Sequence, residues 1–198
     1  MSYESSKKFI RKWEGGVYRP TGAGAYDPNL TKWGFREDTY QGYFPGESVL
    51  CITEEQWDKM FTAGFWKKSG ADVWPEPLDL VMADFAFNSG PKQALRYLQR
   101  AVGAEQDGIL GPETRTKTLD TVKVKGARAV AIMVQGQRIR FLKYLYQKSV
   151  EKRQAWDQCQ RSAGDSEARE DCGPKPELAP ISGWLSRVND LGRTAGLV

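Results

Sequence analysis

Phe9-Ile10-Arg11-Lys12-Trp13-Glu14-Gly15-Gly16 is the stretch that decides the fold. It predicts a helix whose C-terminal end is a carboxylate residue, Glu14. Its apolar residues recur at helical spacing with basic residues between them, which predicts a short amphipathic helix. The two glycines end this helix, since glycine adopts the left-handed C-terminal conformation without strain. Glu14 is therefore the expected last helical residue.

Glu14 has features of a general acid. The last turn of a helix carries unsatisfied carbonyl groups, and their partial negative charge disfavours an anion. Nearby aromatic rings, Trp13 and Tyr18 among them, would exclude water, and both effects favour the protonated carboxyl group. Such a group is suited to protonating a glycosidic oxygen. The alternative is a solvent-exposed glutamate before a glycine cap.

The rest of the chain predicts a mainly α (α+β) protein with a small N-terminal β-region. From Val17 to Phe44, turn-forming residues alternate with Tyr, Trp and Thr, which indicates turns and short strands. Helices are expected from a capping box at Thr53, from Pro77 to Asn88, from Pro91 to about Val102, from Pro112 to Leu119, from about Lys125 to Gln158 with or without a break near Gly136, and from Trp184 to Leu191. We expect a single domain over residues 1–198, with a catalytic part over about 1–120 and a helical part over about 121–198.

The sequence contains no histidine. Ser–His–Asp hydrolases, Cys–His peptidases and His-ligated zinc sites each need an imidazole, so none of them can be built here. Carboxylates remain as the natural acid–base pair, and this favours glycoside chemistry. The seven tryptophans are a weak further indication of carbohydrate binding. No metal or cofactor is implied.

Charge and hydropathy limit the partners. The net charge of +4 is spread along the chain, and without a nucleic-acid-binding motif we expect no nucleic-acid partner. No segment predicts a bilayer span, so no stable membrane insertion is expected. Met1 to Trp13 contains no apolar run typical of a signal peptide. We therefore expect cytoplasmic synthesis, with release by another component before action in the periplasm or cell wall.

A second carboxylate is needed opposite Glu14. Asp27 lies in the turn-rich segment after Glu14, and Thr31 could hold a water beside it. Taken singly, Asp27 before a proline is also a common turn former, and Thr31 an ordinary strand residue. Glu37 and Asp38 are rivals for the second role.

Three cysteines allow one disulfide. Cys159 and Cys172 flank a short polar stretch, and a bond between them would indicate an oxidising compartment. The alternative is two unpaired surface thiols. Cys51 lies in an apolar run and is expected to be buried and unpaired.

Several motifs, in order, resemble glycoside hydrolase family 108, the N-acetylmuramidases. They are Trp13-Glu14-Gly15-Gly16, Asp27-Pro28, Thr31-Lys32-Trp33-Gly34-Phe35, the segment from Ala83 to Gly90, Leu98-Gln99 with the segment from Asp107 to Thr114, and the segments Arg138 to Tyr144 and Gly183 to Val188. The chain departs from the family at Asn29-Leu30, in the longer gap of Arg19 to Ala25, and in the Cys-bounded insertion 159–172. Leu98 to Pro112 also looks like a separate peptidoglycan-binding repeat, although an integral helix–turn–helix is the preferred interpretation.

The resemblance implies a lysozyme-like fold and hydrolysis of the β-1,4 bond between N-acetylmuramic acid and N-acetylglucosamine in peptidoglycan. It implies that Glu14 is the catalytic acid and supports Asp27 and Thr31 as the residues that handle water. The substrate-binding candidates are Tyr18, Trp33, Trp66 and Asn88, with Trp66 expected to be exposed beside Lys67. A monomeric endolysin released by a holin, or a lysin delivered by a secretion machine, fits these features. A lytic transglycosylase using Glu14 alone and an inactive peptidoglycan-binding protein remain alternatives.

Overall fold

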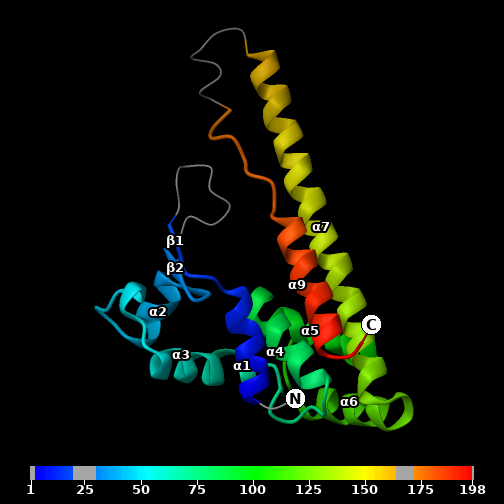
Figure 1. Ribbon diagram of the computed structural model, residues 1–198. Coiled ribbons are helices and arrows are strands. Elements are labelled where there is room, and N and C mark those ends of the chain that lie inside the picture. The colour runs from blue at the N-terminus through cyan, green and yellow to red at the C-terminus, as the bar shows by residue number, and fades with distance from the viewer. Residues whose placement is uncertain (1–2, 20–29, 164–171, 198) are drawn as a thin grey trace.

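A computed structural model describes residues 3–19, 30–163 and 172–197. The chain is mainly helical, with one small sheet near the N-terminus (Figure 1). Its elements are α1 Tyr3–Trp13, β1 Val17–Tyr18, β2 Thr31–Lys32, β3 Phe35–Arg36, α2 Glu37–Tyr43, the 3-10 turn η1 Val49–Cys51, α3 Glu54–Phe61, the π-helical turn η2 Thr62–Trp66, α4 Leu78–Ser89, α5 Pro91–Val102, α6 Pro112–Lys125, α7 Ala127–Ser162 and α9 Ile181–Thr194. The predicted fold class is confirmed.

Local sequence signals placed several helix ends correctly. The Thr53 hydroxyl accepts a hydrogen bond from Gln56 N, and the Gln56 side chain accepts one from Thr53 N, which is the predicted capping box at the start of α3. Two predictions were wrong in extent: α6 continues to Lys125, and the predicted β-region includes the helix α2. Of the two options left open for α7, the unbroken helix through Gly136 is the one found.

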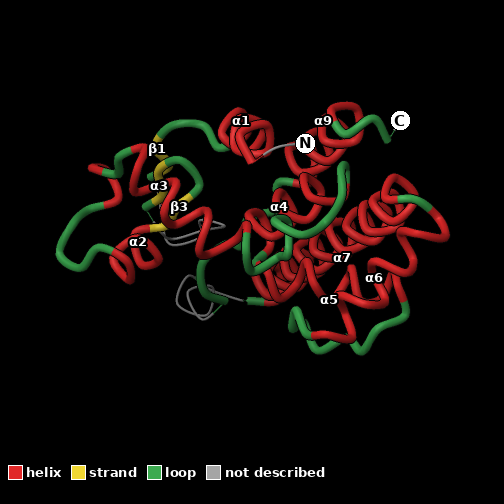
Figure 2. Tube along the Cα trace, turned by 90° about the horizontal axis from the view of Figure 1, so that it is seen from below, coloured by secondary structure: helices red, strands yellow, loops and turns green. Residues whose placement is uncertain are grey.

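Helix α4 is the centre of the core. It is buried from Leu78 through Phe87, because α1, α5 and α7 all pack against it (Figure 2). A helix that is apolar around most of its circumference is typical of such a position. Asp84 departs from this apolar pattern, since it is a fully buried carboxylate in the middle of the helix.

The sheet attaches to the end of α1. Its order is β1-β2-β3, and both pairings are antiparallel. Trp33 and Gly34, which link β2 to β3, both have positive φ angles, and Trp33 N donates a hydrogen bond to Gly16 O at 3.3 Å. Phe35 is buried against Trp57 and Phe87. The turn of this hairpin is thereby fixed beside the glycines that follow Glu14.

An extended segment, residues 172–180, returns along α7 and leads into α9 (Figure 1). Side chains on one face of α7 hold its backbone. Ala179 N donates to the Ser149 hydroxyl at 3.0 Å, Arg153 donates to Pro176 O, and the Trp156 indole donates to Gly173 O at 2.9 Å. This pairing brings α9 back against the first half of α7, where Gln135 donates to Val188 O at 3.0 Å.

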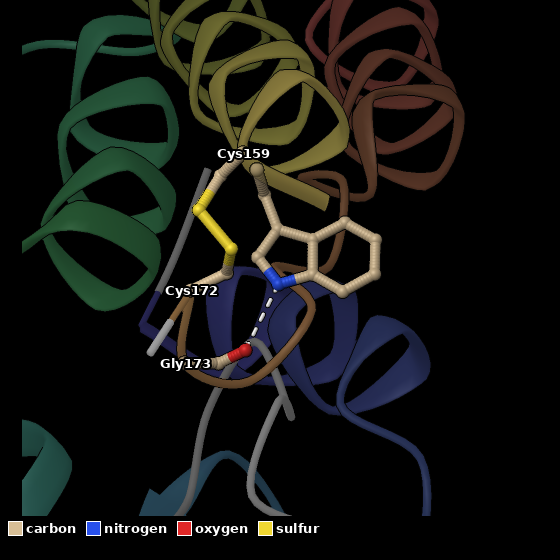
Figure 3. The surroundings of a disulfide bond; sticks show 4 residues. Cys159, Cys172 and Gly173 are labelled. Carbon is tan, nitrogen blue, oxygen red and sulfur yellow. Dashed lines mark hydrogen bonds between the residues drawn. A yellow bond between two sulfur atoms is a disulfide. The ribbon is translucent and has the colours of Figure 1, made fainter. Parts of the chain in front are cut away.

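The disulfide between Cys159 and Cys172 closes the far end of this pairing (Figure 3). The predicted bond is therefore confirmed, and Cys51 is the free cysteine. The expectation that Cys51 is buried was wrong: it is exposed at the end of η1. Within the described ranges, no helix is long and apolar enough to cross a membrane.

We predict that replacing Cys159 and Cys172 by serine lowers the free energy of unfolding by about 3 kcal/mol. The reason is the entropy of a loop that the bond closes in the unfolded chain. Urea unfolding without reductant measures this change. Cys51→Ser is the matched control and should leave the midpoint unchanged. Equal midpoints for the double variant and the control would contradict the prediction.

Candidate active site

Glu14 follows α1 directly. Its backbone N–H donates to Ile10 O at 3.1 Å, which continues the helical pattern, and Gly15 turns the chain away with a φ of +22°. The prediction that Glu14 is the last residue of the helix is right to within one position. Its side chain is 17% exposed, so the carboxylate is largely enclosed but reachable.

The hairpin turn lies directly against this carboxylate. A Cβ atom at Gly34 would come within 2.5 Å of both Glu14 Oε2 and a Phe87 ring carbon. Gly34 also has a φ of +82°, which residues other than glycine rarely adopt. The glycine therefore lets the hairpin approach Glu14 more closely than any other residue could.

A buried charge network holds the other carboxylate oxygen. Arg187 of α9 forms an ion pair with Glu14 Oε1, and its Nε donates to Asp84 Oδ1 at 2.9 Å. Arg138 of α7 donates to Asp84 Oδ2 at 2.5 Å. Two carboxyl side chains and two guanidinium groups from four helical segments thus meet in one network. Asp84 and Arg138 are fully buried, and Arg187 is nearly so.

Each buried charge in this network depends on its partners. Burial raises the pKa of Asp84, but Arg187 and Arg138 outweigh burial and hold that pKa below its usual value. Burial lowers the pKa of Arg187, but Asp84 and Glu14 outweigh it and raise that pKa overall. For Arg138, burial prevails over the attraction of Asp84 and the pKa is lowered.

Sequence reasoning missed the three partners of Glu14 in this network. Arg187 lies 173 positions from Glu14, and no periodicity or spacing links residues so far apart. Two signals were available. All three partners lie in segments that resemble the family, and Asp84 is a charged residue inside an otherwise apolar helix, between Ala83 and Phe85 in α4. A charge in such a run is almost never fully buried unless it is paired.

The other water-handling candidates are only partly visible. Asp27 lies outside the described residues. Thr31 is in the central strand β2, where it pairs with Tyr18 on one side and Arg36 on the other. The strand that contains Thr31 leads into the turn with Gly34, and this turn lies against the Glu14 carboxylate. Thr31 and Glu14 are therefore in neighbouring parts of the structure.

The two rival carboxylates have structural partners. Glu37 accepts hydrogen bonds from Gln41, from Ser48 and from Val49 N, and so ties α2 to η1. Asp38 is exposed and bonded to Arg36 and Thr39. Burial raises the pKa of Asp38, but the bonds from Thr39 and Arg36 outweigh it and hold the pKa below its usual value.

The four substrate-binding candidates lie in different environments. Tyr18 is 43% exposed in β1. Trp33 is half-buried, and the Arg11 guanidinium lies 3.8 Å from its ring centroid. Asn88 is half-buried at the end of α4. The expectation that Trp66 is exposed was wrong. The π-helical turn η2 directs its ring inward, where it lies in the core against Tyr3.

Among the residues that the structure describes, no group of three or more His, Cys, Asp or Glu side chains is placed to hold a metal ion.

Residues 7–90 match the model of the family described as Glycosyl hydrolase 108. Over this segment the chain is similar to glycosyl hydrolase family 108. The segment contains Glu14, Gly34 and Asp84, whereas Arg138 and Arg187 lie beyond it. The predicted resemblance is confirmed, and the family match supports a glycoside hydrolase.

The whole fold has a solved counterpart. The structure of Brucella abortus SagA matches with a TM-score of 0.67 and 22% identity, covering 98% of this chain and 94% of that chain. At this identity the match shows the fold, and it extends over α7 and α9 as well as the family segment. A comparison with curated protein sequences returns no match.

We predict that Asp84→Asn costs about 3–5 kcal/mol of unfolding free energy, because two buried guanidinium groups lose their shared carboxylate. Urea unfolding at neutral pH measures this. Because the folded pKa of Asp84 is depressed, its contribution is present above its unfolded pKa of about 4 and is lost as pH falls through the folded value. The variant should therefore lose less stability on acidification than the parent.

Asp38→Asn is the control, since it removes an exposed carboxylate that also pairs with an arginine. It should change neutral-pH stability little. Equal stability of the Asp84 and Asp38 variants would show that the network is not needed for the fold.

Proposed function

We propose that this protein is an N-acetylmuramidase that hydrolyses the β-1,4 bond between N-acetylmuramic acid and N-acetylglucosamine in peptidoglycan, with Glu14 as the general acid. The observation that carries the proposal is the position of Glu14. Its carboxylate is largely enclosed, held by Arg187 and reached by a glycine turn, within the segment that matches a glycosidase family.

The proposed reaction uses the geometry around Glu14 as follows. Glu14 gives its proton to the glycosidic oxygen as the bond from that oxygen to the anomeric carbon breaks. Arg187 then lies beside the carboxylate that this step creates, so its charge stabilises the product of the proton transfer. Asp84 fixes the Arg187 guanidinium through its Nε and Nη2 atoms, which keeps this charge in place.

For the second half of the reaction we propose Asp27 and Thr31. Water attacks the anomeric carbon, Asp27 accepts the proton of that water or stabilises the positive charge on the sugar, and Thr31 orients the water. The order Glu, Asp, Thr along the chain supports this assignment. Glu37 and Asp38 already form hydrogen bonds within α2 and to η1. These bonds also support the assignment, because they give both rival carboxylates a structural role.

The proposed substrate contacts are Tyr18, Trp33 and Asn88, and the proposed partner is the glycan strand itself. We propose that the protein acts as a monomer in the cell wall, after release by a holin or a secretion machine. The confirmed disulfide supports action in an oxidising compartment.

We predict that Glu14→Gln lowers the rate of peptidoglycan clearing by about 10²–10⁴-fold, the usual contribution of a general acid. Turbidity of purified cell walls measures the rate, and circular dichroism checks that the helices remain. Glu54→Gln is a matched control, because Glu54 also pairs with an arginine but is exposed on α3. Full activity of the Glu14 variant would remove the proposed mechanism.

The products distinguish hydrolysis from transglycosylation. We expect mass spectrometry of the fragments released by the unmodified protein to show reducing N-acetylmuramic acid ends, because water is the proposed acceptor. Anhydro ends would instead identify a lytic transglycosylase, which needs Glu14 but no water-activating carboxylate.

We also predict that Asp27→Asn lowers the clearing rate without loss of stability, since it removes the second carboxylate. Glu37→Gln and Asp38→Asn should retain activity and serve as comparisons. An unaffected Asp27 variant together with an inactive Asp38 or Glu37 variant would move the second role to that residue.

A further inference from the structure

A recess of about 330 Å³ opens beside the charge network. It lies between the end of α4, the middle of α7 and the start of α9. Both α4 and α9 pack against α7, and α9 lies along α7 in Figure 1. Its lining includes Asn88, Phe141, Leu142, Leu145 and Trp184. The family match ends at residue 90, so most of this lining comes from the part of the chain beyond it.

Helix geometry places the recess one turn from the buried charged residues that hold Glu14. Asp84, Arg138 and Arg187 form the buried charged layer. Residues three or four positions apart lie on the same helix face, about 5.4 Å further along for one turn. One such step along each helix, away from the charged layer, leads from Asp84 to Asn88, from Arg138 to Phe141 and Leu142, and from Arg187 to Trp184. The recess is therefore stacked directly on the layer that holds Glu14.

The recess combines two kinds of surface. Leu142 is buried, while Leu145, Phe141 and the Trp184 indole are half-buried, so these side chains offer apolar and aromatic surface. At the rim, Asn88 Oδ1 accepts a hydrogen bond from the Ser89 hydroxyl at 3.4 Å. Within the described part of the chain, nothing accepts a hydrogen bond from the Asn88 amide nitrogen.

We propose that this recess is a subsite for one N-acetylated sugar ring of the glycan strand, adjacent to the ring whose bond is cleaved over Glu14. The acetamido methyl group packs on the apolar side chains, the Trp184 indole covers a face of the ring, and Asn88 donates to the acetamido carbonyl. The proposal rests on the proposed function for the identity of the strand, but its contacts can be tested by binding alone.

Apolar and polar surface in this arrangement selects for the acetamido group. A hydroxyl group in its place would leave the apolar side chains without a partner and would give Asn88 a shorter, poorly placed acceptor. A site built to bond a polar group discriminates strongly against a ligand lacking that group. We therefore expect the recess to distinguish N-acetylglucosamine from glucose in otherwise identical chains.

The test uses the full chain with Glu14→Gln, so that the ligand is not cleaved, and isothermal titration calorimetry. The two probes are the β-1,4-linked tetramer of N-acetylglucosamine and cellotetraose, which are both uncharged and differ in the acetamido groups. The parent should bind the first probe more tightly. Adding Asn88→Ala should lower this preference by about three- to tenfold, the effect of one neutral hydrogen bond.

Adding Trp184→Ala should weaken binding of the N-acetylglucosamine tetramer by about tenfold or more, through lost apolar contact, and Trp184→Phe should restore part of it. Tyr144→Ala is the control, since this exposed aromatic residue lies on α7 outside the recess. If Trp184→Ala does not fold, Asn88→Ala still decides the question, because Asn88 is half-buried at a helix end.

The outcomes separate this proposal from the proposed function. An unchanged preference in the Asn88 variant, or no binding of either probe by the parent, would overturn the subsite. If binding depends on Asn88 while the unmodified protein leaves peptidoglycan intact, the subsite stands and the muramidase proposal fails. If peptidoglycan is cleaved but neither recess variant changes binding, the muramidase proposal stands and the subsite fails.

Discussion

The ion pair of Arg187 with Glu14 and Asp84 is the interaction on which the rest of the structure depends. Asp84 is fully buried in the central helix, and a carboxylate there is tolerated only with its charge paired. Arg138 and Arg187 provide that pairing, and each comes from a different helix of the C-terminal part. The same guanidinium that pairs with the core carboxylate also reaches Glu14 at the end of α1. Stability of the core and orientation of Glu14 therefore both depend on the Arg187 side chain.

This arrangement explains how the C-terminal part helps to hold Glu14. α9 must lie where Arg187 reaches Asp84, and the extended segment before it is fixed along α7 by Ser149, Arg153 and Trp156. The disulfide restrains the far end of that segment. Arg153 and Trp156 lie more than about 20 Å along α7 from Arg138, by the rise of about 1.5 Å per residue, and still contribute to holding Arg187. The recess next to the charged layer is formed by the same three helices.

The opposite side of Glu14 depends on backbone geometry instead of charge. Trp33 and Gly34 hold positive φ angles at the tip of the hairpin, and the absence of a side chain at Gly34 lets the turn lie against the carboxylate. Phe35 anchors the strand that follows in the core. Glu14 is consequently fixed between a rigid charged layer and a hairpin that contacts it closely.

The sequence by itself determined what local patterns encode: the helix that ends next to Glu14, the capping box at Thr53, α4 and α5, and the disulfide as one of two options. Tertiary structure alone decided which charges meet, because Glu14, Asp84, Arg138 and Arg187 are brought together by helix packing over separations that no local period records. It also decided that the ring of Trp66 lies in the core although two lysines follow it in the sequence, since the π-helical turn sets the direction of that ring. Local periodicity fixes which face of a helix is apolar, but the neighbours of that face depend on how all the helices fill one core.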